Sequence, residues 1–220
     1  MAREVWCTAV LFDLDGVLVD SSASIERHWR AWADRKSVDI QEILRVAHGR
    51  RTIETVALVA PGLDLEAEVA ALAAAEASDV QGVVSLPGVP RLLASIPPGR
   101  WAVVTSGVLA VAEARLRHVG IAIPEVLVSA DMVNRGKPDP EGYLKAAWRL
   151  GIAPSECAVV EDSPAGLEAA RAARMESVAV CTTHERDQLG AAALIVDEID
   201  HIHVEVIGER MSLWSKWSEQ

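Results

Sequence analysis

Two aspartates that follow a short apolar run are the residues of this chain best suited to chemistry. Asp13 and Asp15 are separated by one residue, follow the apolar run at residues 9–12, and precede Gly16. We expect the run to be a buried parallel strand, and open α/β sheets bind ligands at the carboxyl ends of such strands. The two carboxylates repel each other, and a hard divalent cation relieves that repulsion. One carboxylate can then act as a nucleophile while the other transfers protons.

Two later segments carry groups that suit an anionic substrate. Ser106 and Gly107 come shortly after the apolar run at residues 101–104, and Lys137 lies in the segment Gly-Lys-Pro-Asp-Pro at 136–140. A small hydroxyl and a glycine amide at a strand-to-helix junction can hold an anion, although a plain helix cap would have the same composition. The prolines fix the backbone around the lysine. Its ammonium group can therefore neutralise both a carboxylate and a transferring phosphoryl group.

A further strand end adds carboxylates, and the whole set resembles a known family. Glu161 and Asp162 follow the apolar run at residues 157–160. In type and order, four motifs resemble those of the haloacid dehalogenase superfamily: FDLDGVLVD at 12–20, VTSG at 104–107, GKPDP at 136–140 and VVEDSPAG at 159–166. The resemblance covers nearly all of the chain except the tail from His201. Each later motif is short, and it is their order at successive strand ends that makes the resemblance specific.

The resemblance implies a phosphatase of the branch that acts on sugar and polyol phosphates. It implies that Asp13 is the nucleophile that forms an aspartyl-phosphate and that Asp15 is the acid and base. Lys137 would be the third catalytic residue, and Ser106 and Gly107 would bind the phosphate.

The same resemblance implies Mg²⁺ as the cofactor. The Asp13 side chain, the Asp15 backbone carbonyl and Asp162 would bind the ion, with Glu161 acting through a water molecule or from behind the direct ligands. Magnesium prefers oxygen ligands and keeps several waters. A haloacid dehalogenase would need neither Asp15 nor the metal, so these carboxylates argue against that activity.

The strand ends require an α/β fold, which we expect to be a doubly wound (Rossmann-like) parallel sheet core with an inserted α-helical cap domain. The expected strands are residues 9–12, 101–104, 126–128, 157–160, 178–180 and 193–196. Residues 21 to 84 have helical periodicity almost throughout. We therefore expect residues 1–18 and 85–220 to form the catalytic core and residues 19–84 to form the cap, which could close over the site as a lid.

Within the expected cap, two arginines are candidates for substrate binding. Arg50 and Arg51 follow His48 and Gly49 at a break between expected helices, and a guanidinium group there can bind an oxyanion. We favour Arg51 because it begins the next helix, although a turn with solvated arginines remains an alternative. His48 is expected to be a packing or turn residue. Trp29 and Trp32 recur at helical spacing and are expected in a core rather than against the substrate.

Composition limits the partners. The net charge of −11 and the pI of about 5.0 argue against nucleic acid or an anionic membrane. We expect a small phosphorylated metabolite as substrate, and a monomer or weak homodimer. Residues 1–4 show no signal-peptide pattern, and Cys7, Cys157 and Cys181 are expected to be reduced thiols of a cytoplasmic protein.

Several functions remain open at this stage. We predict a Mg²⁺-dependent phosphomonoester hydrolase, but a sugar phosphomutase of the β-phosphoglucomutase type shares all four core motifs. A non-catalytic phosphometabolite-binding protein would be expected to lack a core residue, and none is missing. Neither the phosphorylated metabolite nor the oligomeric state follows from the sequence, and the role of the tail from His201 also stays open.

Overall fold

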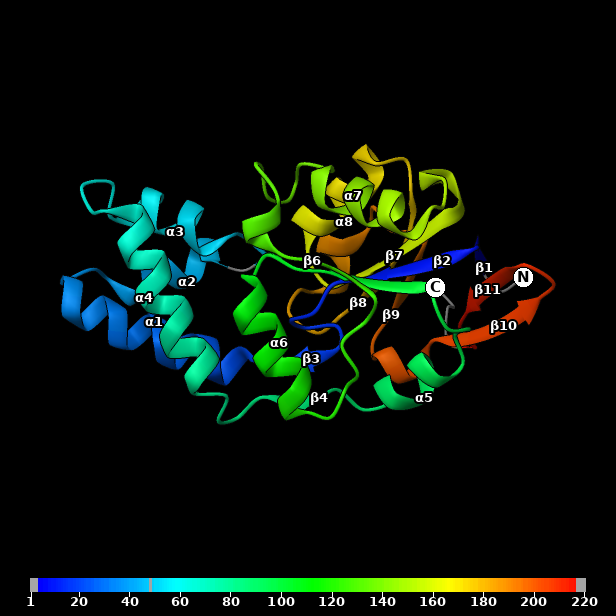
Figure 1. The fold of residues 1–220 in the computed structure, drawn as a ribbon, viewed down its shortest axis with the longest axis horizontal. Coiled ribbons are helices and arrows are strands. Elements are labelled where there is room, and N and C mark those ends of the chain that lie inside the picture. Colours follow the sequence, from blue (N-terminus) through cyan, green and yellow to red (C-terminus); the bar gives the residue numbers. More distant parts are fainter. Residues whose placement is uncertain (1–3, 48, 217–220) are drawn as a thin grey trace.

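The structure, a computed structural model, describes residues 4–47 and 49–216 and is built around a parallel sheet (Figure 1). Its six strands run in the order β6-β5-β2-β7-β8-β9, and every pairing between them is parallel. The strands are β2 (Ala9–Phe12), β5 (Trp101–Val104), β6 (Val126–Val128), β7 (Cys157–Glu161), β8 (Glu176–Val180) and β9 (Leu194–Val196). The first three have the bounds expected from sequence, and the others differ by one or two residues at an end. The chain winds outward from β2 in both directions, which confirms the doubly wound fold.

Helices cover both faces of this sheet because its strands are apolar on both sides. Along β2, Val10 and Phe12 belong to one apolar cluster while Ala9 and Leu11 belong to the other, as the alternation of a strand requires. In Figure 1, α7 and α8 lie on one face and α5 and α6 on the other. These helices are α5 (Val89–Ala94), α6 (Leu109–His118), α7 (Glu141–Leu150) and α8 (Pro164–Ala172), and short 3₁₀ turns span Ala130–Met132, Pro154–Glu156, Arg186–Leu189 and Ile199–His201.

Four more helices form a block at one end of the molecule (Figure 1). They are α1 (Ser22–Lys36), α2 (Ile40–Ala47), α3 (Thr52–Val59) and α4 (Leu65–Ser78), and we call them the helical block. The antiparallel pair β3 (Val19–Asp20) and β4 (Val84–Ser85) leads into and out of it. Its own apolar cluster contains Trp29 and Trp32, which meet edge to face with ring centroids 5.6 Å apart, so both lie in a core as predicted. Trp29 also lines the cavity described below, which the prediction did not include. The cap bounds of 19–84 stay a prediction.

A second, antiparallel sheet accounts for the tail that the sequence left open. Strands β10 (His203–Ile207) and β11 (Arg210–Trp214) form a hairpin, and β11 pairs with β1 (Glu4–Cys7) in the order β1-β11-β10. Only Thr8 separates β1 from β2, and of these two strands the sequence predicted the second alone.

Two smaller observations bear on earlier expectations. Cys7, Cys157 and Cys181 are all free thiols, and the first two are buried. Among the described residues, every helix is too short or too polar to span a bilayer.

Candidate active site

Asp13 lies directly after β2 and is paired with the lysine predicted to neutralise it. Its carboxylate is buried, and Lys137 Nζ donates to Asp13 Oδ1 at 2.5 Å and to Glu161 Oε1 at 2.6 Å. The ammonium group thus lies between carboxylates from two adjacent strand ends, although Lys137 is 124 residues from Asp13 along the chain. This geometry brings three of the predicted site residues together.

Charge around Asp13 remains unbalanced despite the lysine. Burial raises the pKa of the Asp13 carboxyl to about 7, with Lys137 opposing the shift and the carboxylates of Glu161 and Asp15 adding to it. An anionic nucleophile at this position therefore needs further positive charge close by.

A cluster of carboxylates supplies a place for that charge. Asp13, Glu161 and Asp162 are buried and offer oxygens that all lie within 4.8 Å of one another. Burial, followed by the charges of Glu161 and Asp13, raises the pKa of Asp162 well above its ordinary value. A set of closely spaced oxygen donors with one ammonium group among them fits a hard divalent cation such as Mg²⁺.

Within this cluster, Glu161 differs from the two aspartates because its oxygens are already in use. Oε1 accepts from Lys137 Nζ and from Tyr143 Oη at 2.8 Å, and Oε2 accepts from the amides of Asp162 and Ser163 at 2.9 and 3.0 Å. Although burial opposes it, these contacts, Lys137 foremost, hold the pKa of Glu161 below its ordinary value. The arrangement fits a residue that holds Lys137 and leaves direct metal contact to its neighbours.

Two glycines let the chain approach this cluster closely. Gly16 has φ of +85°, and a Cβ added to it would lie 2.0 Å from Asp162 Oδ2. A Cβ added to Gly166 on α8 would lie 1.7 Å from Glu161 Oε1. No larger residue fits at either position without moving a carboxylate.

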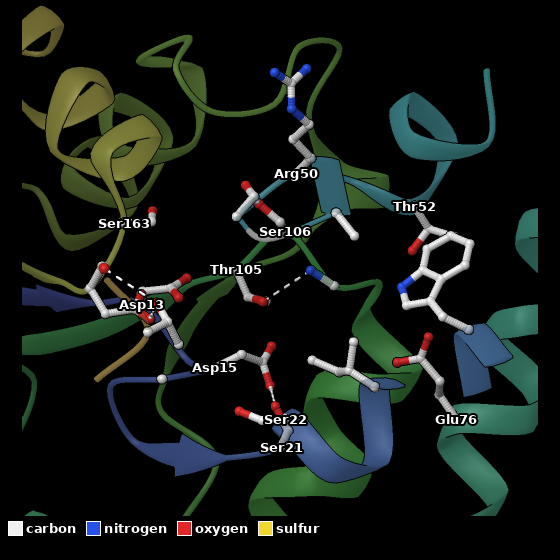
Figure 2. A pocket seen from close by; sticks show the side chains of 18 of the residues that line it. Asp13, Asp15, Ser21, Ser22, Arg50, Thr52, Glu76, Thr105, Ser106 and Ser163 are labelled. Carbon is white, nitrogen blue, oxygen red and sulfur yellow. Dashed lines mark hydrogen bonds between the residues drawn. The ribbon is translucent and has the colours of Figure 1, made fainter. Parts of the chain in front are cut away.

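Asp15 turns toward a different set of partners. Its Oδ1 accepts from Ser21 Oγ at 2.6 Å and from Arg115 NH1 at 2.7 Å (Figure 2 shows the first bond). Arg115 also donates through NH2 to Glu76 Oε2 at 2.5 Å. Sequence interpretation missed both partners of Asp15 and the contact of Arg115 with Glu76, because an arginine and a glutamate inside helical patterns ordinarily indicate solvated faces.

A cavity opens beside Asp13 and Asp15, between the sheet edge and the helical block. In Figure 2 its labelled side chains come from both parts of the molecule. The core contributes Asp13, Asp15, Thr105, Ser106, Gly107, Arg115 and Asp162, and the helical block contributes Ile25, Trp29, Leu44, Ala47, Arg50, Thr52 and Glu76. A small ligand bound here would touch charged groups on one side and a mixed polar and apolar wall on the other.

The predicted anion cradle lines the cavity, but its groups already have partners. Ser106 Oγ donates to the carbonyl of Gly49 at 2.8 Å, and the Gly107 amide donates to Thr105 Oγ1 at 3.0 Å. Binding a phosphate through these groups would require them to exchange those bonds. Thr105, which is buried and follows β5 directly, is a second hydroxyl at this wall that the sequence interpretation did not single out.

The two predicted arginines of the helical block occupy different places. Arg50 lines the cavity, and Figure 2 shows its side chain pointing away from Asp13 and Asp15. Arg51 instead donates to the carbonyls of Val133 and Asn134 at 3.1 and 3.0 Å. It therefore joins the helical block to the loop that leads to Lys137. His48 lies outside the described residues.

Comparisons with known proteins show what this chain is similar to in sequence and in fold. The chain is 41% identical over 206 residues to hexitol phosphatase A of Escherichia coli strain K12, a match that covers 90% of this chain and 94% of that protein. It is 30% identical over 219 residues to β-phosphoglucomutase of Bacillus subtilis strain 168, covering 91% and 94%. Among solved structures, CbbY from Rhodobacter sphaeroides in complex with phosphate superimposes with a TM-score of 0.71 at 25% identity, covering 88% of this chain and 95% of that one.

A family match settles the membership. Residues 7–174 match the family model of haloacid dehalogenase-like hydrolases, a span that contains Asp13, Asp15, Lys137 and the Glu161–Asp162 pair. The chain belongs to the haloacid dehalogenase-like hydrolase family.

Proposed function

We propose that this chain is a Mg²⁺-dependent phosphomonoester hydrolase that acts on a small sugar or polyol phosphate through an aspartyl-phosphate. One observation carries the proposal: the buried Asp13 carboxylate is paired with Lys137 at the wall of a cavity that also contains Asp15. The similarity to hexitol phosphatase A supports both the reaction and the polyol class of substrate.

In this mechanism Asp13 attacks phosphorus and Asp15 gives a proton to the departing alcohol oxygen. Asp15 then takes a proton from a water molecule, whose oxygen attacks the phosphorus of the aspartyl-phosphate and frees Asp13 and inorganic phosphate. Lys137, hydrogen-bonded to Asp13 at 2.5 Å, offsets negative charge on the phosphoryl oxygens.

The metal site would be formed by the Asp13 side chain, the Asp15 backbone carbonyl and Asp162, with Glu161 behind them. Mg²⁺ bound there would neutralise charge on the carboxylates and on the phosphoryl group. The unbalanced carboxylates of this cluster support that assignment.

Ser106 and Gly107 would bind the phosphate, and Arg50 on the helical block would contribute to substrate choice. Arg51, for which the sequence predicted the same role, would instead hold the loop that leads to Lys137. The helical block would act as a cap that closes over the cavity and excludes bulk water. A cytoplasmic location and a monomeric or weakly dimeric state belong to the same proposal.

A phosphate-release screen tests the reaction. Sugar, polyol and nucleotide monophosphates are offered with Mg²⁺, and release of inorganic phosphate is compared between the wild type and Asp13→Asn. We expect turnover of at least one sugar or polyol phosphate, and a loss of at least about 10⁴-fold in the variant, because it removes the nucleophile. Turnover that survives Asp13→Asn or exhaustive EDTA treatment would contradict the proposed chemistry.

A sugar phosphomutase is the second candidate, because the chain is 30% identical to a β-phosphoglucomutase. A mutase must exclude water and bind a bisphosphate in two orientations, which needs positive charge for a second phosphate. Among the described residues of the helical block that line the cavity, Arg50 is the one basic residue, and the acidic Glu76 offsets its charge. Turnover in ¹⁸O-water separates the candidates, since hydrolysis places label in released phosphate. Conversion of a hexose 1-phosphate to its 6-phosphate, accelerated by a trace of bisphosphate, would instead establish a mutase.

A further inference from the structure

One buried cation in the cavity has no part in the mechanism described above. The side chain of Arg115, on α6, is only 3% exposed and lies between carboxylates from two parts of the molecule. Asp15 comes from the loop after β2, and Glu76 comes from the last turns of α4 in the helical block. A buried arginine held at both ends by carboxylates fixes both of them in space.

The hydrogen bonds divide the two oxygens of Asp15 between different tasks. Both Arg115 NH1, at 2.7 Å, and Ser21 Oγ, at 2.6 Å, donate to Oδ1. Within the described residues, no hydrogen bond ends on Oδ2, so this oxygen is free to exchange a proton with a substrate or water. The two donors therefore set the angle at which Asp15 presents Oδ2.

Glu76 sets the position of Arg115 in turn. Its Oε2 accepts from Arg115 NH2 at 2.5 Å, and its side chain is 12% exposed. Helices α4 and α6 pack against each other along this contact. If α4 moved away from α6, Glu76 would leave the guanidinium group and Arg115 would lose one of its two fixed points.

We propose that Arg115 is a positioning residue for Asp15, and that Glu76 makes this positioning depend on the docking of α4 against α6. The proton transfer by Asp15 is then efficient only when the helical block lies against the core. This inference rests on the proposed phosphomonoester hydrolysis, and it adds a residue and a coupling to it.

A pair of substrates with similar size and different leaving groups tests the positioning. Phenyl phosphate and p-nitrophenyl phosphate both lack sugar hydroxyls, but p-nitrophenolate departs without help while phenolate gains more from a proton donor. The ratio of their kcat/KM values therefore reports how well Asp15 donates. Since kcat/KM covers steps up to the first irreversible one, later hydrolysis of the aspartyl-phosphate does not obscure it.

For Arg115→Met we expect kcat/KM to fall by about 100-fold with phenyl phosphate and by no more than about 10-fold with p-nitrophenyl phosphate. Arg115→Lys keeps the charge but reaches only one carboxylate, so its ratio of kcat/KM values should lie between those of Arg115→Met and the wild type. Glu76→Gln keeps a hydrogen-bond acceptor and should change the ratio in the same direction by about 3- to 5-fold.

Matched controls lie on the same two helices. Arg117→Met removes an arginine of α6 that pairs with Glu113 on the surface, and Glu68→Gln changes a carboxylate of α4 that pairs with Lys36 inside the helical block. Both should leave the ratio unchanged. Circular dichroism and thermal melting show whether each variant is folded. If Arg115→Met does not fold, Arg115→Lys still provides the test.

The outcomes separate this inference from the proposed function. Equal losses on both substrates in folded Arg115 variants would mean a structural role only, and would overturn the inference while hydrolysis stands. A changed ratio in Arg115→Lys but not in Glu76→Gln would overturn the coupling to α4. If the wild type released phosphate from neither compound nor from any sugar or polyol phosphate, the proposed function itself would fall, and the inference with it.

Discussion

The two walls of the cavity are built on different principles. On the sheet side, Asp13 is buried at the cavity wall and accepts a hydrogen bond from the buried Lys137, which also donates to Glu161. Asp13 and Glu161 lie at the ends of the adjacent strands β2 and β7. On the side of the helical block, Arg50 is exposed and Thr52 is half-buried. The sheet side holds fixed charges, whereas Arg50 and Thr52 on the block side can adjust to a ligand.

This difference suggests a division of labour. Charges that stabilise a transition state must be held before the substrate arrives, because reorganisation during the reaction is costly. Contacts that choose among substrates need only be complementary to the organic part of the ligand. Changes to the nucleophile, to Lys137 or to the metal ligands should therefore damage every substrate alike, and changes to block residues that touch only the organic part of the ligand should damage some substrates more than others.

The largest expected effect concerns the metal. Asp162→Ala removes a carboxylate that we assign as a direct ligand, and should weaken Mg²⁺ binding by more than about 100-fold. Glu161→Gln alters a residue whose oxygens are bound to Lys137, Tyr143 and backbone amides, so the loss should be about 10-fold. Isothermal titration calorimetry with Mg²⁺ measures both. A larger loss in Glu161→Gln would reverse the assignment.

Glycine substitutions compare the packing beside the carboxylate cluster with the packing of a loop in the helical block. Gly166→Ala would place a Cβ 1.7 Å from Glu161 Oε1, and should destabilise the protein by about 2–4 kcal/mol because a buried carboxylate must move. Gly62, in the helical block, has no atom within 4 Å of an added Cβ. Gly62→Ala should be neutral or stabilise by up to about 1 kcal/mol. Urea unfolding measures both, and similar losses in the two variants would contradict the difference in packing.

The sheet wall was largely predictable from sequence, and the reason is local. Each apolar run ends in a polar motif, and parallel strands bring those ends to one edge. That logic identified Asp13 and Asp162 and found β2, β5 and β6 with their observed bounds. Lys137 was identified from the prolines that fix the backbone around it. Neither inference needs knowledge of how distant helices pack.

The missed features depend on contacts between distant segments. Arg115 is 100 residues from Asp15, and a mid-helix arginine is buried only when tertiary packing encloses it. The first turn of α6 is capped from elsewhere, since the Leu109 amide donates to Asp131 Oδ1 at 2.9 Å. Strand β1 is defined by its pairing with β11, more than two hundred residues away. Local patterns carry no signal for such contacts.

The raised pKa values of the carboxylate cluster predict how metal and pH act on stability. Burial raises the pKa of Asp13 to about 7 from 3.8. A carboxyl group whose pKa is raised by folding contributes most stability below its unfolded pKa, and that contribution is lost as pH rises through the folded value. Without metal, the protein should therefore lose stability between about pH 4 and pH 7 through this group. Mg²⁺ competes with the proton for the carboxylate and should restore the lost stability.

Thermal melting with Mg²⁺ or with EDTA measures this effect. The rise in Tm caused by Mg²⁺ should be greater at pH 8 than at pH 5, by an amount equivalent to about 1–2 kcal/mol. Asp13→Asn cannot titrate at this position and should reduce the difference between the two pH values. An equal effect of Mg²⁺ on Tm at both pH values in the wild type would show that folding does not raise the pKa of Asp13.

The smallest expected effect, and the one that differs most between substrates, concerns Arg50 of the helical block. Arg50 lines the cavity, so Arg50→Ala should lower kcat/KM for the best sugar or polyol phosphate by about 10-fold. Hydrolysis of p-nitrophenyl phosphate, which offers no hydroxyls to bind, should change by no more than about 2-fold. Steady-state kinetics on both substrates, with Arg30→Ala as a control from the exposed face of α1, measure the selectivity.

Arg51 makes this comparison sharper, because it belongs to the helical block but binds the core. Its guanidinium group holds the carbonyls of Val133 and Asn134, and its aliphatic part packs on Gly136, next to Lys137. Arg51→Ala should therefore loosen the segment that places the Lys137 ammonium group, and should slow both substrates by a similar factor of about 5–10. If Arg51→Ala instead spared p-nitrophenyl phosphate as Arg50→Ala should, Arg51 would be a substrate-binding residue. The division between the two walls would then follow the chain segment from which a residue comes, and not the surface that its side chain contacts.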